Sequence, residues 1–122
     1  MWLCTTRGFF SAVSDQDNPG YVKVRARAEQ DIRNLHELVP DAPDPVEWAG
    51  TDYRWRLLLT LEQWLTLAAE LSADVFDYTN FKNAIQDKQR AYVYSEVWGL
   101  MLDELQDGQM WPDEPSREWI ND

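Results

Sequence analysis

The most regular alternation of hydrophobic and polar residues lies at residues 53–59. Large apolar side chains occupy every second position of this segment: Tyr53, Trp55, Leu57 and Leu59. Arg54 and Arg56 lie between them. A period of two places successive side chains on opposite faces of an extended chain. The pattern therefore predicts a strand with one apolar and one basic face.

The period changes to that of a helix at Thr60. Thr60-Leu61-Glu62-Gln63 has the spacing of a capping box, in which the threonine hydroxyl accepts from a backbone N–H and the glutamine side chain reaches back. Apolar residues then recur at helical spacing up to Leu71. We expect this helix to close on the strand and form the centre of the core. The large side chains expected to be buried are Trp55, Leu57, Trp64 and Trp98.

The N-terminal part of the chain predicts further strands. Residues 2–13 are rich in β-branched and aromatic residues around Gly8, which is typical of one long strand or two short ones. Residues 14–20 have the composition of a turn and end in Asn-Pro-Gly. In residues 21–27 apolar positions again alternate with basic ones. The two alternating segments predict a hairpin.

Helical spacing returns in three more segments: residues 28–39, a short segment around Phe81 and Ile85, and residues 90–105. The first of these helices must end near residue 39, because prolines follow at positions 40, 43 and 45. Residues 41–51 are expected to form a loop. The predicted order is β-β-α-β-α-α-α, which gives an α+β fold with a small antiparallel sheet of three or four strands and helices on one face. We expect a single domain over residues 1–107 and an acidic, Trp-containing C-terminal tail over residues 108–122.

The charge of the chain bears on its partners. Acidic residues outnumber basic ones 22 to 11, and the net charge is −11. Such a field opposes binding to duplex nucleic acid and to anionic membranes, and it favours a protein partner with a basic surface. The same charge is also compatible with a role in solubility alone. It therefore narrows the class of partner without identifying one.

Several features bear on localisation. No apolar run approaches the roughly 20 residues that span a bilayer, and the N-terminus lacks the basic region of a signal peptide. The single cysteine, Cys4, excludes an intrachain disulfide and favours a reducing compartment. We expect Cys4 to be a small buried side chain. The expected localisation is cytoplasmic.

The sequence lacks motifs for metal binding and nucleophilic catalysis. A zinc site needs three or four ligands at suitable spacing, and the chain has one Cys and one His. That histidine, His36, falls beside an apolar helical stripe, which indicates a boundary residue rather than a general base. No glycine-rich phosphate loop or calcium loop is present. We expect no metal and no cofactor; a hydrolase that uses two carboxylates is left as a third alternative.

Basic residues give the first candidate site. Arginines and a lysine on the polar side of the predicted strands would converge on one surface if those strands share a sheet. Guanidinium groups suit bidentate contacts to phosphate or carboxylate. The alternative is a solvated sheet face on which nearby carboxylates pair with these charges. The candidate anion-binding residues are Arg7, Lys23, Arg25, Arg27, Arg54 and Arg56.

Tryptophans among carboxylates give the second candidate site. Tryptophan is enriched at binding hot spots, and acidic surroundings steer a basic partner. The alternative is that these tryptophans pack back on the domain. The candidate partner-binding residues are Trp48, Trp111, Asp113, Glu114, Glu118 and Trp119.

Four short motifs together resemble a family of small proteins from actinobacteria and their phages that has no assigned activity. They are residues 2–11, with Thr5-Thr6-Arg7-Gly8-Phe9-Phe10-Ser11, Val24-Arg25-Ala26-Arg27, Asp52-Tyr53-Arg54-Trp55-Arg56, and Asn80-Phe81-Lys82. The resemblance covers about residues 2–105 and implies a bacterial or phage-infected cytoplasm as the setting. It implies no mechanism.

Two functions follow from the sequence as hypotheses. The first is a non-enzymatic acidic interaction protein, for example a phage-encoded inhibitor of a host or defence protein that handles nucleic acid. Its support is the charge and the tryptophans among acids. The alternative is a protein that binds or processes a nucleotide or phosphate ligand through the basic sheet face.

Overall fold

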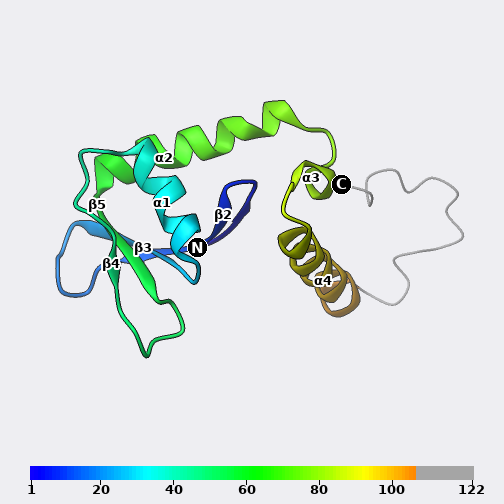
Figure 1. Ribbon diagram of the computed structural model, residues 1–122, viewed down its shortest axis with the longest axis horizontal. Coiled ribbons are helices and arrows are strands. Elements are labelled where there is room, and N and C mark those ends of the chain that lie inside the picture. Colours follow the sequence, from blue (N-terminus) through cyan, green and yellow to red (C-terminus); the bar gives the residue numbers. More distant parts are fainter. Residues whose placement is uncertain (107–122) are drawn as a thin grey trace, which may run out of the picture. The chain divides into compact units, whose positions relative to one another are not determined.

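The computed structural model describes residues 1–106, which fall into two compact units. The first unit, Met1–Asp74, is an antiparallel sheet with two helices, and the second begins at Val75. The elements of the first unit are β1 (Trp2–Thr5), β2 (Gly8–Ser14), β3 (Tyr21–Ala26), α1 (Glu29–Leu38), β4 (Val46–Glu47), β5 (Trp55–Thr60) and α2 (Leu61–Ala73). A short 3-10 helix, η1 (Asp74–Asp77), follows, and then α3 (Phe81–Ala84) and α4 (Lys88–Leu105) (Figure 1).

The sheet has five strands in the order β1-β2-β3-β5-β4, and every neighbouring pair is antiparallel. The α+β class and the alternating strands at β3 and β5 are as predicted, whereas the number of strands exceeds the expected three or four. Residues 2–13 divide into two strands at a tight turn, where the Thr5 hydroxyl accepts from the backbone N–H groups of Arg7 and Gly8. A two-residue strand, β4, lies within the segment predicted to be a loop.

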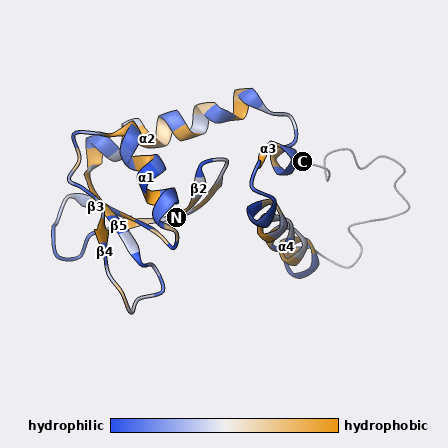
Figure 2. Ribbon diagram, in the orientation of Figure 1, coloured by the Kyte–Doolittle hydropathy of each residue, from blue (hydrophilic) through white to orange (hydrophobic). Residues whose placement is uncertain are grey.

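One face of the sheet packs against α1 and α2, which lie on the same side of it (Figure 1). Alternate residues of β2, β3 and β5 supply the strand side of this core, and Ile32, Leu35, Leu67 and Leu71 supply the helix side. The strand residues of the core are Phe10, Ala12, Val24, Ala26, Leu57 and Leu59. In Figure 2 the hydrophobic colour is prominent on β3 and β5, in keeping with these core positions.

The predicted capping box at the start of α2 is confirmed. The Gln63 backbone N–H donates to the Thr60 hydroxyl at 3.1 Å, and the Gln63 side chain accepts from the Thr60 N–H at 2.9 Å. The buried side of α2 is formed by Leu67 and Leu71, while Trp64 is only partly buried at the edge of the core. Trp64 is therefore less central than predicted, because Leu67 and Leu71 form the buried side of α2.

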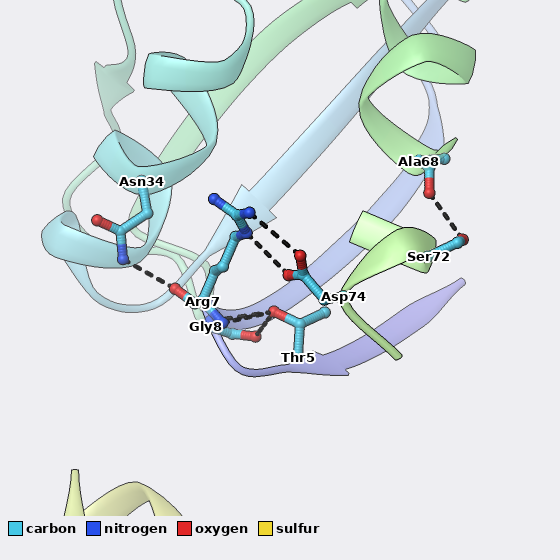
Figure 3. A network of polar contacts seen from close by, with 7 residues as sticks. All are labelled: Thr5, Arg7, Gly8, Asn34, Ala68, Ser72 and Asp74. Atoms are coloured by element: carbon cyan, nitrogen blue, oxygen red, sulfur yellow. Dashed lines mark hydrogen bonds and ion pairs between the residues drawn. The ribbon is translucent and has the colours of Figure 1, made fainter. Parts of the chain in front are cut away.

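The turn between β1 and β2 is held by α1 and by the end of α2. The Arg7 guanidinium contacts both carboxylate oxygens of Asp74, with Nε–Oδ2 at 2.9 Å and Nη2–Oδ1 at 3.2 Å (Figure 3). The Asn34 side-chain amide donates to the Arg7 carbonyl oxygen at 2.9 Å. Gly8 has a φ of 150°, and a Cβ built on it would lie 2.6 Å from Asp31 Cγ. This position therefore requires glycine.

The second unit is built on aromatic contacts. The Phe81 ring stacks on Tyr94 at a centroid distance of 5.6 Å and also contacts Tyr78. Tyr94 and Ile85 are buried, whereas Trp98 is 37% exposed with the Lys82 ammonium 4.3 Å from its ring. The prediction that Trp98 is buried is wrong, because α4 buries Tyr94 in its place. No helix within residues 1–106 has the length and apolar character needed to cross a membrane.

Two predictions for residues of the sheet are also corrected. Cys4 is exposed rather than buried, because its position in β1 places it on the face opposite the helices. Tyr53 is buried, but it precedes β5 and does not belong to the helix-facing core. The Thr51 hydroxyl lies within hydrogen-bond distance of the Trp48 and Tyr53 carbonyl oxygens, and this bend takes Tyr53 out of the alternation.

Candidate anion-binding site

The sheet face opposite α1 and α2 carries a row of paired residues that crosses all five strands. Each residue of the row is the direct cross-strand partner of the next, so their side chains point to the same face. In spatial order the row is Trp2, Ser11, Arg25, Arg56 and Val46. We call this surface the arginine face and define it by Ser11, Arg25 and Arg56.

Arg25 is fixed by a hydroxyl and by an aromatic ring. Its Nη2 donates to Ser11 Oγ at 2.7 Å, and Ser11 is itself only 1% exposed. Its Cζ lies 4.5 Å from the centroid of the Tyr53 ring. Arg25 Nε is buried and has no hydrogen-bond partner. The guanidinium is thus held in place by contacts that do not neutralise its charge.

Arg56 has still fewer polar contacts. Its Cζ lies 4.4 Å from the centroid of the Trp48 ring, and its Nε is buried without a hydrogen-bond partner. Stacking on an aromatic ring leaves the terminal N–H groups of a guanidinium available for in-plane hydrogen bonds. Trp48 is half exposed beside it.

Arg27 extends the same surface beyond the end of β3. Its Cζ lies 4.2 Å from the centroid of the Tyr53 ring and 5.7 Å from that of Phe9. The Tyr53 ring therefore contacts two guanidinium groups, those of Arg25 and Arg27. Tyr53 was predicted to be a core residue, and its contact with these arginines was not visible in the sequence.

Within residues 1–106, the arginine face has no ion pair that compensates its positive charge. Among the described residues, the ion pairs that form are Arg7–Asp74, Arg33–Glu29 and Arg54–Glu47, and none of them involves Arg25, Arg27 or Arg56. Like charges directly opposite each other across two strands are unfavourable. Arg25 and Arg56 are such a pair. The arrangement costs stability in the absence of an anion.

The structure divides the six basic residues that the sequence grouped together. Arg25, Arg27 and Arg56 lie on one face, and Lys23 lies two residues before Arg25 on the same face of β3, paired with Leu58. Arg54 is neutralised by Glu47 at 2.8 Å. Arg7 lies in the β1–β2 turn and is neutralised by Asp74, as described above.

Of the candidate partner-binding residues, only Trp48 lies within the part of the chain that the structure describes. Trp48 belongs to the surroundings of Arg56. The remaining residues of that set, Trp111, Asp113, Glu114, Glu118 and Trp119, lie outside the described residues. Within residues 1–106, no three His, Cys, Asp or Glu side chains gather in a way that would hold a metal ion.

The arginine face carries residue types that suit anion binding. Two guanidinium groups on directly paired residues carry several N–H donors, a donor type that suits the oxygens of a phosphate or a carboxylate. The described residues place no histidine on it: His36, on α1, has its Nε2 at 3.0 Å from the Ala42 carbonyl oxygen.

Comparisons with known proteins add nothing to this description: no family model, no curated protein and no solved structure matches the chain significantly.

Proposed function

We propose that the protein binds a small phosphate-bearing ligand, of the nucleotide class, on the arginine face. The observation that carries the proposal is the direct pairing of Arg25 with Arg56, in which both Nε atoms are buried without a partner and no described carboxylate pairs with either charge. A buried donor without a partner costs about 1–3 kcal/mol. A bound anion would offset the repulsion between the two positive charges.

Phosphate is favoured over a carboxylate by the number of donors. One arginine fork matches the two oxygens of a carboxylate, whereas two adjacent forks match the larger set of oxygens on a phosphate. The aromatic rings beside the arginines favour a ligand that also has a flat ring. A nucleotide combines both features.

The net charge of −11 does not prevent such binding, but it limits the ligand. Exposed charges are largely screened beyond about 8 Å at physiological ionic strength. A compact ligand at Arg25 and Arg56 is therefore influenced mainly by the local positive charge. A long duplex would in addition meet the negative surface of the molecule.

The other hypothesis from the sequence, an acidic protein that binds a basic partner, has less support from the described residues. Of its candidate residues, only Trp48 is described, and its ring lies against the Arg56 guanidinium. A contact with a cation makes Trp48 part of the arginine surface. It is therefore assigned to the phosphate site.

Isothermal titration of the purified protein with pyrophosphate, and then with nucleoside mono- and triphosphates, tests the proposal. The test variant is Arg25→Gln with Arg56→Gln. The control variant, Arg33→Gln with Lys88→Gln, removes the same charge from residues outside the arginine face. We expect the test variant to lose at least about tenfold in affinity, because each lost charged hydrogen bond contributes about 1.5–3 kcal/mol.

The control is expected to bind within about twofold of the wild type, because the affected charges are exposed and screened. Circular dichroism of both variants establishes that they are folded. Equal affinity of a folded test variant and the wild type for every phosphate compound would rule out the arginine face as the site.

A further inference from the structure

The arginine face has an exposed tryptophan at each side. Trp2 on β1 is 70% exposed and belongs to the same cross-strand row as Arg25. Trp48, which follows β4, is 53% exposed and lies against Arg56. Large exposed aromatic side chains are costly on a soluble surface and are enriched where proteins bind other molecules. Two of them beside one charged centre point to a ligand that has aromatic groups on both sides of an anion.

The spacing along the row fits such a ligand. Neighbouring strands lie about 4.8 Å apart, so Trp2 and Arg25, two strands apart, are separated by about 10 Å. Arg25 and Arg56 are on adjacent strands, and Trp48 contacts Arg56 directly. A phosphate held between the two arginines would therefore have Trp48 in contact with one arginine, and Trp2 about two strand spacings beyond the other.

The ring of Trp2 is supported for stacking. It makes an edge contact with Phe9 at a centroid distance of 5.9 Å, and Phe9 in turn lies near the Arg27 guanidinium. The β1–β2 ladder fixes the backbone of Trp2 opposite Ser11. The ring is thus presented at the edge of the sheet by a defined set of neighbours while most of its surface stays in solvent.

We infer that the ligand is a short single-stranded oligonucleotide that lies across the strands, with one phosphate at Arg25 and Arg56 and bases stacked on Trp2 and Trp48. This inference rests on the proposed function, because it assigns the phosphate to the same two arginines. Stacking of bases on aromatic side chains beside a positively charged groove is a general means of binding single strands without sequence preference. A duplex does not fit, since its bases are stacked inside the helix and unavailable to the tryptophans.

Fluorescence anisotropy with 5′-labelled thymidine oligonucleotides of two, four and eight nucleotides tests the inference. The test variants are Trp2→Leu, Trp48→Leu and the double variant. The matched control is Trp98→Leu, which removes a partly exposed tryptophan of the second unit that also contacts a cation, Lys82. An abasic tetramer with the same phosphates, a duplex of the same length and a poly-glutamate peptide serve as competitors.

We expect each single tryptophan substitution to weaken binding of the tetramer about tenfold, in the range that loss of one stacked base gives. The control variant is expected to bind as the wild type does. The tetramer should compete better than the abasic tetramer, the duplex and poly-glutamate. Affinity should rise from two to four nucleotides and change little at eight, because the site has one phosphate centre and two rings.

The outcomes separate this inference from the proposed function. If the abasic tetramer binds as well as the tetramer, or if the folded tryptophan variants bind normally, the assignment of an oligonucleotide as the ligand is wrong. Arginine-dependent binding of pyrophosphate would in that case still support a phosphate site. If poly-glutamate binds more tightly than the tetramer with the same arginine dependence, the partner is an acidic protein segment. If pyrophosphate binding does not depend on Arg25 and Arg56, both proposals fail together.

Discussion

Arg25 on β3 and Arg56 on β5 are direct cross-strand partners, and no described carboxylate pairs with either of them. Two positive charges in this relation oppose the pairing of the strands that carry them. Natural sheets place opposite charges, hydroxyls or aromatic pairs at such positions when stability alone is at stake. The pairing of these two residues is therefore unfavourable for the stability of the sheet itself.

This relationship predicts that Arg56→Gln does not lower the free energy of unfolding by more than about 1 kcal/mol. Relief of like-charge repulsion contributes about 0.2–1 kcal/mol in favour of the variant. Loss of the stacking on Trp48 costs about 0.5–1 kcal/mol, which offsets it. Urea denaturation of the two proteins measures the difference.

Leu57→Ala, at the next position of the same strand, is the control for this measurement. Leu57 is 1% exposed, and its truncation should cost about 2–5 kcal/mol. A loss at Arg56 as large as that at Leu57 would show that the arginine is a structural residue.

Gly8→Ala should destabilise the protein by several kcal/mol, because two effects combine. The φ of 150° is strained for any residue with a Cβ, and the new Cβ would lie 2.6 Å from Asp31 Cγ and 2.8 Å from the Phe10 ring. Gly50→Ala separates the effects, since Gly50 has a φ of 90° and nothing within 4 Å of a built Cβ. It should cost only about 1–2 kcal/mol, the price of the backbone conformation. Thermal unfolding that shows equal losses at the two positions would contradict the steric part of this account.

The parts of the fold that depend on neighbours in sequence were predictable. The capping box at Thr60 requires two residues three positions apart, and both of its hydrogen bonds are present. The alternation in β3 and β5 likewise follows from a local period. By contrast, β4 is only two residues long and follows prolines, so its extended conformation is evident only from its pairing with β5.

The candidate site was predictable only in part, because the residues that neutralise a charge can be distant in sequence, and the sequence alone does not show which of them become neighbours in the fold. Arg7 forms an ion pair with Asp74, which is 67 positions away in the sequence, so its charge is already neutralised. Tyr53 follows the alternation of β5 in sequence, but a bend held by the Thr51 hydroxyl directs it to the arginines. Burial of the two Nε atoms is likewise a property of packing and has no sequence signal.

Thr60→Ala should lower the free energy of unfolding by about 1 kcal/mol, the usual cost of losing an N-cap side chain. The substitution leaves the Gln63 backbone N–H without its acceptor at the start of α2. Thr66→Ala, an exposed threonine further along the same helix, removes the same atoms without removing a cap, and it should leave stability unchanged or slightly higher. Urea denaturation of the pair measures the capping contribution, and equal effects at the two positions would show that the cap contributes nothing.

The Arg7–Asp74 ion pair predicts a pH dependence of stability. Hydrogen bonds from the Arg7 guanidinium hold the pKa of Asp74 below its usual value of 3.8, although partial burial acts in the opposite direction. A carboxyl group whose pKa is lower in the folded state stabilises that state above its unfolded pKa, and the contribution is lost as pH falls through the folded pKa. Asp74→Asn should therefore lower the free energy of unfolding by up to about 1 kcal/mol at pH 7, as expected for a partly exposed pair. The difference from the wild type should shrink steadily as pH falls below about 4.

A double-mutant cycle with Arg7→Gln isolates this pair from other acidic groups. At pH 7 the two single substitutions should cost similar amounts, and the double substitution should cost little more than either one, because each removes the same interaction. The coupling energy should fall as pH drops toward the lowered pKa of Asp74 in the folded protein, because protonation removes the charge of the pair. Urea denaturation of the four proteins at pH 7, 4 and 2.5 measures it. A coupling energy that stays constant over this range would mean that the two residues interact through packing rather than through charge.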